Sequence, residues 1–430
     1  MYPDWPRSKT DLVPLPQVDG PRLAAFDFHG PQKIEFLEYL GEGSHAHVVE
    51  VNIKGKEYAL KLFRFLYDSD WLGPGEIPLT EAGAGLTALA RYSEPFNCEC
   101  RAFARLQETG HTYLALECYG YVLLDEEHER VLQEKFQLEF NGNMDDPGLE
   151  DMRGRFLGER SGKAPPIRGI LKELGKPGDN NEDDPPNLTV AAARKILQDT
   201  IAFQQLGIIY LDVRRNQLFD NRFCDLSTAV TIPHFIATPE LNPKLSQDEK
   251  TMLERETFRI SRSDYTSFIQ LLLVASLDKR QTSKVLDKIP VFPAADRESG
   301  TYTERYNMRS SRRRQQEAVG VFTYVDPRKY DWKATSSKTN GIRRTGKRRR
   351  MTAQYRIPAH PQRWYCDFPP EKAQEIKYWF AHQFALEYRV TIGLVFPELA
   401  GTGEYLAKKK WEEKQEAKGY GDLDPEVLVI

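Results

Sequence analysis

Cysteine is scarce in this 430-residue sequence, which has five cysteines and no Cys-x-x-Cys pair. The spacing argues against a zinc ribbon, and so few cysteines give no disulfide framework, so we expect a reducing compartment. Long apolar runs are also missing, because the stretch beginning at Leu271 is too short to cross a bilayer. The first residues carry charges and prolines where a signal peptide needs an apolar segment. The sequence therefore predicts a soluble intracellular protein with no membrane partner, which is not secreted.

A core-forming composition is present despite these absences. Hydrophobic residues make up 40% of the chain, and 22 Phe and 20 Tyr supply large apolar side chains. This composition argues against wholesale disorder. The length is compatible with two lobes around one site, or with one domain that carries long insertions.

Charge is distributed unevenly along the chain. The formal net charge is only −3, but residues 305–356 contain 16 Lys/Arg against 3 Asp/Glu. Such an excess predicts a basic arm for nuclear import or for contact with nucleic-acid phosphates, while a solvated loop is the competing interpretation. The candidate contact residues are Arg312, Arg313, Arg314, Arg343, Arg344, Lys347, Arg348, Arg349 and Arg350.

Hydrophobic periodicity divides the chain into segments. Alternating residues predict antiparallel strands over 34–40, 47–51 and 57–65, and another strand over 113–124. Helical spacing predicts helices over 96–110, 189–206, 263–277 and 370–390, and a charged helix near the C-terminus. Short strands are predicted around residues 208–227, with Asp220-Asn221 as a two-residue turn.

We therefore expect an α+β chain with a small antiparallel β lobe, a mostly helical lobe and long insertions. The predicted parts are an irregular arm (1–33), the small lobe (34–175, with an insertion at about 125–165) and the larger lobe (188–300), followed by a disordered basic arm (301–356) and a helical segment (357–430). Residues 167–174 form a short apolar run between polar stretches.

A glycine-rich bend and a buried lysine are the first signs of chemistry. Gly41 and Gly43 lie between two predicted strands, where their backbone N–H groups can approach phosphates. Lys61 lies within an apolar strand and needs a polar partner, for which Glu99 on the next predicted helix is the candidate. A glycine loop, a strand lysine and a helix glutamate in this order match the ATP-binding half of a protein kinase.

The ordered motifs resemble a known family. The segments are Leu60-Lys61-Leu62-Phe63, Phe96-Asn97-Cys98-Glu99-Cys100-Arg101-Ala102, Ile170-Leu171-Lys172, Asp212-Val213-Arg214 and Asp225-Leu226-Ser227. Over roughly residues 34–277 the chain resembles fungal kinase-like proteins classed with the Sim4 kinetochore complex subunit family. The resemblance implies a two-lobed protein-kinase-like fold, ATP and Mg²⁺ as cofactors, protein partners in a multi-subunit assembly and a nuclear location.

The resemblance also implies roles for individual residues. Asp212 would be the catalytic aspartate, Asp225 would hold the metal, and Asp264 would support the catalytic loop structurally. The expected nucleotide-binding residues are Gly41, Gly43, Val48, Lys61, Glu99, Lys172 and Glu173, the last two belonging to the segment that would meet adenine.

Several positions depart from the kinase pattern. Tyr210-Leu211 replaces the usual His-Arg before the catalytic aspartate, and Ser227 replaces the glycine that follows the metal-binding aspartate. The second metal ligand would be either Gln217, which lies five residues after Asp212, or Asn216.

These departures favour a nuclear kinase-like interaction module, a pseudokinase or a weakly active enzyme, with a role in a kinetochore-type assembly. The first alternative is an active ATP- and Mg²⁺-dependent phosphotransferase. The second is a chromatin or nucleic-acid binder that acts through the basic arm.

Overall fold

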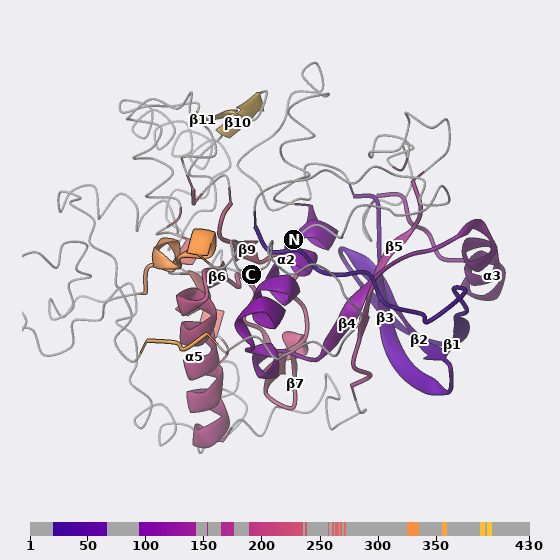
Figure 1. Cartoon of the computed structure of the whole chain (residues 1–430), viewed down its shortest axis with the longest axis horizontal. Coiled ribbons are helices and arrows are strands. Elements are labelled where there is room, and N and C mark those ends of the chain that lie inside the picture. The colour runs from indigo at the N-terminus through magenta and orange to yellow at the C-terminus, as the bar shows by residue number, and fades with distance from the viewer. Residues whose placement is uncertain are drawn as a thin grey trace, which may run out of the picture.

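Alternating apolar and polar residues build an antiparallel sheet of five strands in the order β1-β2-β3-β5-β4 (Figure 1). This sheet and the helices around it confirm the predicted α+β class and the three consecutive N-terminal strands. The strand bounds are β1 Glu35–Gly43, β2 Ala46–Ile53, β3 Lys56–Phe63, β4 Cys118–Leu123 and β5 Arg168–Lys172. The apolar run at 167–174 therefore supplies β5, which lies inside the sheet between β3 and β4.

The computed structural model describes residues 20–66, 94–142, 165–175, 189–234 and 325–334. Shorter described pieces are residues 153, 237–238, 355–358, 388–391 and 394–397, and single helical residues between 257 and 271. The predicted C-terminal charged helix lies outside the described residues, as does most of the predicted helix over 370–390.

Each of the three long helices begins at a side chain that caps it. The helices are α2 Pro95–Thr109, α3 Glu126–Phe136 and α5 Val190–Gln205. The capping side chains of Glu94, Asp125 and Thr189 accept hydrogen bonds from backbone N–H groups in the first turn of the helix that follows. Short 3-10 helices occur at η3 Thr112–Leu114, η5 Arg215–Gln217 and η7 Pro327–Lys329.

Two small pairs of strands follow α5. The pairs are β6 Ile208–Ile209 with β9 Val230–Thr231, and β7 Leu218–Phe219 with β8 Arg222–Phe223. Asp220 and Asn221 connect β7 to β8, and both have positive φ, as a tight two-residue hairpin turn requires. The turn predicted at these two residues is confirmed.

Two buried clusters lie on opposite faces of the sheet. Leu60 and Leu62 of β3 belong to the cluster that also contains Leu132 of α3. Phe63, on the other face, belongs to a larger cluster that continues through α2 to Ile196 of α5. Figure 1 shows α2 between the sheet and α5, so this helix connects the β-rich part of the chain to the rest.

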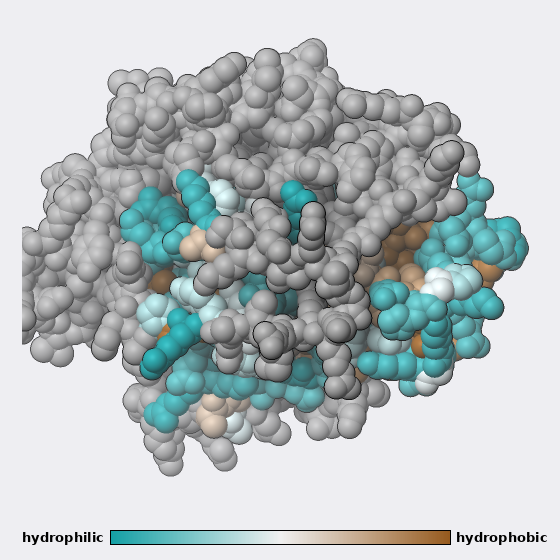
Figure 2. Space-filling model, viewed as in Figure 1, coloured by the Kyte–Doolittle hydropathy of each residue, from teal (hydrophilic) through white to brown (hydrophobic). Residues whose placement is uncertain are grey.

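The segment predicted as an insertion, residues 125–165, lies between β4 and β5 and begins with helix α3. Helix α3 forms there because its apolar face, with Leu132 buried and Val131 and Phe136 partly buried, packs against the sheet, while its outer face carries charged residues. Figure 2 shows this hydrophilic outer surface over the end of the molecule that carries α3. The strand predicted over 113–124 begins later, at Cys118, because η3 occupies Thr112–Leu114.

Parts of the two predicted arms are packed against the fold. Leu23 of the N-terminal segment is buried, and Phe26 N–H donates a hydrogen bond to Tyr121 O of the edge strand β4 at 2.9 Å. Within the basic region, Tyr330 is buried and stacks on Arg105 of α2. The prediction of disorder is wrong for residues 325–334, because their apolar side chains reach the core.

The C-terminal described residues form the hairpin of β10 Tyr388–Thr391 and β11 Leu394–Pro397. The helix predicted over 370–390 is therefore wrong at residues 388–390, where strand pairing overrides the local helical pattern. Within the described part of the chain, we find no helix with the length and apolarity required to cross a bilayer.

Candidate functional site

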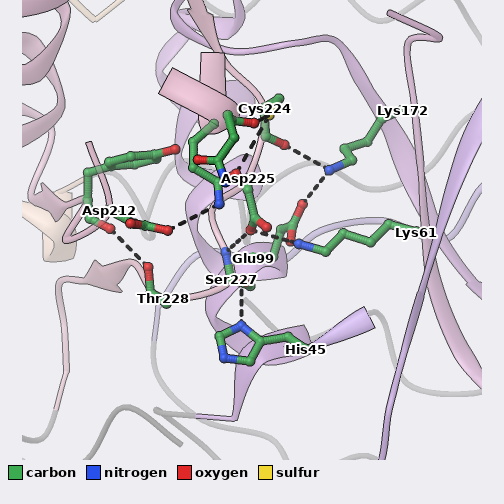
Figure 3. Close-up of polar contacts among 12 residues, drawn as sticks. His45, Lys61, Glu99, Lys172, Asp212, Cys224, Asp225, Ser227 and Thr228 are labelled. Atoms are coloured by element: carbon green, nitrogen blue, oxygen red, sulfur yellow. Dashed lines mark hydrogen bonds and ion pairs between the residues drawn. The ribbon is translucent and has the colours of Figure 1, made fainter. Parts of the chain in front are cut away.

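Lys61 is the lysine that the sequence placed within an apolar strand, and it is almost completely buried. Because neighbouring strand residues point to opposite faces, Lys61 points away from the cluster that holds Leu60 and Leu62. Its Nζ lies 2.8 Å from Glu99 Oε2 and 2.7 Å from Asp225 Oδ1 (Figure 3). The structure thus brings together a strand lysine, a helix glutamate and an aspartate that are far apart in sequence.

Glu99 is shared by two lysines. Its carboxylate has no exposed surface, and its second oxygen, Oε1, lies 2.9 Å from Lys172 Nζ. Lys172 is the last residue of β5, and its ammonium also donates to Cys224 O at 2.8 Å. Figure 3 shows both lysine side chains extending toward Glu99. The side chain of Lys172 is therefore part of the charged cluster. The sequence had predicted only that Lys172 belongs to the segment expected to meet adenine.

The charges in this cluster depend on one another. Burial alone would raise the pKa of Asp225, but the positive charges of Lys61 and Lys172 hold it far below its usual value. Burial opposes the charged form of Lys61 as well, and the carboxylates of Asp225 and Glu99 raise the pKa of Lys61 above its usual value. Both side chains are therefore ionised at neutral pH.

Asp212 lies next to this cluster, after β6. Gln217 Nε2 donates to Asp212 Oδ2 at 3.1 Å, and Arg214, two residues further along the chain, forms an ion pair with Oδ1. Burial raises the pKa of Asp212, while Arg214 acts in the opposite direction. Asn216 is exposed, so Gln217 is the one of the two candidate metal ligands whose side chain lies beside Asp212.

Asp264 supports the backbone that leads into Asp212. Its carboxylate is buried and accepts hydrogen bonds from Tyr210 N at 3.0 Å and Leu211 N at 2.6 Å. Leu211 has a φ of 70°, a left-handed conformation that costs energy for a residue with a side chain. The two hydrogen bonds hold this strained residue in place, and burial raises the pKa of Asp264 to about 6.

The glycine-rich bend lies against the aspartate segment. His45, at the turn between β1 and β2, shares a hydrogen bond with Ser227 Oγ at 2.9 Å (Figure 3). Gly41 has a φ of 140°, which favours glycine, whereas an added Cβ at Gly43 would meet nothing within 4 Å. Val48 pairs with Lys61 across β2 and β3. The bend is thus fastened directly to the residues that follow Asp225.

Glu173 follows β5 and connects neighbouring segments. Its carboxylate forms a bidentate pair with Arg222 of β8, at 2.8 and 2.9 Å. The backbone N–H of Glu173 donates to Glu117 O at 2.8 Å. This N–H, in the segment expected to meet adenine, is therefore already hydrogen-bonded within the protein.

Two buried arginines fix α2 to the segment after α5. Arg101 donates to Thr231 O at 2.8 Å and also to Pro233 O. Arg105 donates to Leu206 O at 2.6 Å and to Ile232 O, and its guanidinium stacks on the Tyr330 ring. Because α2 carries Glu99, these contacts fix the position of the carboxylate that both lysines bind.

Oxygen donors suited to Mg²⁺ in this site include the carboxylate of Asp225 and the amide of Gln217, which lies beside the carboxylate of Asp212. Asp225 Oδ1 already receives Lys61 and the Ser227 N–H, which leaves Oδ2 as the oxygen that would bind a cation. Among the residues that the structure describes, no three His, Cys, Asp or Glu side chains gather as they would around a metal ion. The nine basic-arm residues proposed for import or nucleic-acid contact lie outside the described residues.

Sequence reasoning named Lys172 as a nucleotide-binding residue but missed its side-chain contact, and it missed three other participants in this site. Lys172 was assigned no side-chain contact with Glu99, and His45, Ser227 and Arg214 were given no role. A lysine at the end of an apolar strand was the one available signal for Lys172, and it is the same signal that identified Lys61.

Comparison with known families decides where the chain belongs. Residues 12–230, just over half of the 430, match the family described as kinetochore Sim4 complex subunit FTA2. The chain belongs to this family. Lys61, Glu99, Lys172, Asp212 and Asp225 all lie within the region that matches the Sim4 subunit family. Comparison with curated proteins gives no match. Membership of a kinetochore complex family implies protein partners in a multi-subunit assembly and a nuclear location.

Proposed function

We propose that this Sim4-family chain is a kinase-like interaction module of the pseudokinase type, of fungal origin, which takes part in a kinetochore assembly and retains a nucleotide-phosphate site. The observation that carries the proposal is the contact of Lys61 with both Glu99 and Asp225. A strand lysine that bridges a helix glutamate and an aspartate after a short hairpin is the arrangement that kinases use to hold nucleotide phosphates.

The order of the surrounding elements supports the proposal that the module is kinase-like. The glycine-rich bend precedes Lys61, α2 carries Glu99, and Asp264 holds the backbone next to Asp212. If Mg²⁺ accompanies the nucleotide, Asp225 and Gln217 are the residues that would hold it. The cation would offset the negative charge of the phosphates.

Other contacts favour an interaction module over an efficient enzyme. Asp212, the candidate catalytic base, receives a hydrogen bond from Gln217 at one oxygen and the exposed charge of Arg214 at the other, which stabilises its carboxylate and makes it a weaker base. The bend at His45 is fastened to Ser227, and the N–H of Glu173 is occupied. In both places, polar groups that a nucleotide would contact already form hydrogen bonds within the protein. The alternative of an active phosphotransferase is less favoured, and the nucleic-acid binder remains a hypothesis from the sequence of the basic arm.

The test separates assembly from catalysis. The full chain, tagged in cells, should co-purify with other Sim4 complex subunits equally well as wild type and as Asp212→Ala, within about twofold. The purified wild type should show no Asp212-dependent ATP hydrolysis in the presence of Mg²⁺. Asp27→Ala, at an exposed carboxylate, is the matched control.

Two results would overturn the proposal. One is a folded Asp212→Ala variant that loses its partners, since an interaction module does not need this carboxylate. The other is ATP turnover by the wild type that disappears in Asp212→Ala, because that outcome would make the chain an enzyme.

A further inference from the structure

The buried cluster contains equal numbers of positive and negative groups. Lys61 and Lys172 supply two ammonium groups, and Glu99 and Asp225 supply two carboxylates. Every one of these charges contacts an opposite charge at 2.7–2.9 Å. Without Lys172 the same cluster would carry one net negative charge.

The groups around the cluster do not disturb this balance. Asp212 is paired with Arg214, so together they contribute no net charge. His45 faces the cluster from the glycine-rich bend, and burial lowers its pKa to about 4, which leaves it neutral at neutral pH. Burial also raises the pKa of Cys224 to about 12 and that of Tyr210 well above its usual value, so both stay neutral.

This balance sets the net charge that a phosphate group would encounter when it approaches the cluster. In a cluster of one lysine and two carboxylates, the net negative charge repels a phosphate, and a divalent cation is needed to compensate. Here Lys172 supplies the compensating charge from within the chain. It also keeps Glu99 paired at 2.9 Å if Lys61 turns toward a ligand, which avoids leaving a buried carboxylate alone.

We propose that the cluster binds the phosphates of a nucleotide without a divalent cation, with Lys172 taking the electrostatic place of the metal. The inference rests on the proposed nucleotide-phosphate site and adds to it the charge requirement of the ligand. Lys172 is thus a specificity-determining residue, because it decides between a free nucleotide and a metal–nucleotide complex.

The experiment measures ADP and ATP binding to the full chain by calorimetry, in EDTA and in MgCl₂. The wild-type Kd in EDTA should lie within about threefold of the Kd in Mg²⁺. Lys172→Met should weaken binding in EDTA by at least about tenfold and regain much of the affinity when Mg²⁺ is added. Lys54→Met, at an exposed turn lysine, is the matched control and should leave both values unchanged.

Two further variants test the charge balance itself. The double variant Lys172→Met/Glu99→Gln restores neutrality and should recover binding in EDTA. Glu99→Gln alone leaves a positive excess and should bind more tightly than wild type in EDTA. Glu99→Gln keeps the inference testable if Lys172→Met does not fold, which circular dichroism would reveal.

Each failure has its own meaning. Wild-type binding that requires Mg²⁺ would overturn the inference and leave the nucleotide-phosphate site standing. Absence of binding under both conditions would overturn the proposed site itself. If Lys172→Met binds as wild type does in EDTA, or if Glu99→Gln brings no gain, the role given to Lys172 is wrong.

Discussion

Lys172 Nζ lies 2.9 Å from Glu99 Oε1, so strand β5 contributes a second cation to a fully buried carboxylate. Removing that carboxylate leaves two lysines in the interior without their common partner. Glu99→Ala should lower the free energy of unfolding by roughly 3–5 kcal/mol, because uncompensated buried charges are costly.

Urea denaturation followed by circular dichroism measures this loss. Glu134→Ala is the control, since that glutamate is exposed and pairs with an exposed arginine, and the expected change is within about 0.5 kcal/mol. A Glu99→Ala loss no larger than that of the control would mean that the lysines find other partners or solvent.

Arg105 should prove essential for stability although it lies outside the charge cluster. It satisfies the carbonyls of Leu206 and Ile232 and stacks on Tyr330, so Arg105→Ala should cost about 3 kcal/mol or more. Arg105→Lys should also destabilise, by about 2 kcal/mol, because a lysine cannot reproduce the planar fork. Thermal denaturation compares both with Arg130→Ala, an exposed arginine on α3. Equal melting temperatures for Arg105→Ala and Arg130→Ala would contradict the expectation.

His45 makes stability depend on pH in a defined direction. Burial lowers its pKa to about 4, with Lys61 adding to the effect and Asp225 opposing it, while the unfolded chain titrates near the ordinary value of 6.5. The unfolded state therefore binds more protons between these values. The contribution of the neutral His45 ring to the free energy of unfolding is therefore fully present above pH 6.5, and it is lost as the pH falls toward 4. Between pH 6.5 and 5, the wild type should lose about 1.5 kcal/mol more than His45→Gln.

The measurement is urea unfolding at several pH values, with His29→Gln as the control at an exposed histidine. Parallel pH profiles for the wild type and His45→Gln would show that the hydrogen bond of His45 to Ser227 does not require the neutral ring.

Gly120 should prove intolerant of a side chain. Its φ is 138°, and an added Cβ would lie 2.7 Å from Phe26 N and 2.8 Å from Ala24 O, both backbone atoms of the N-terminal segment. Gly120→Ala should therefore detach this segment from β4 and cost about 2–3 kcal/mol. Hydrogen exchange measures this detachment directly, because the Phe26 N–H, which donates to Tyr121 O, should lose its protection from exchange. Gly43→Ala, where nothing lies within 4 Å, is the control. Unchanged protection at Phe26 would contradict the prediction.

Periodicity was sufficient to predict the regular elements. The three N-terminal strands, α2, α5 and the turn at Asp220-Asn221 follow from local alternation, helical spacing and turn chemistry. The strand order was not available from local pattern, because β5 enters the sheet between β3 and β4 through long-range pairing. Helix α3 was missed since its buried surface is small and its sequence is mostly charged.

The site was also predictable only where a local sequence pattern determines the contact. The contact of Lys61 with Glu99 follows from the need of a buried lysine for a partner and from motif order. The side-chain contact of Lys172 depends on where β5 lies in the sheet, and the bonds from Arg101 and Arg105 depend on how α2 packs. Residues whose roles come from tertiary position carry at most a weak local signal, such as the lysine that ends the apolar strand β5.

The carbonyls that receive Arg101 and Arg105 belong to Thr231, Ile232 and Pro233, just beyond residue 230, where the family match ends. A fragment cut at residue 230 would keep both guanidinium groups and discard three of their acceptors. We therefore expect a fragment that ends at residue 230 to hold α2, and Glu99 with it, less firmly in position than a fragment that extends past Pro233.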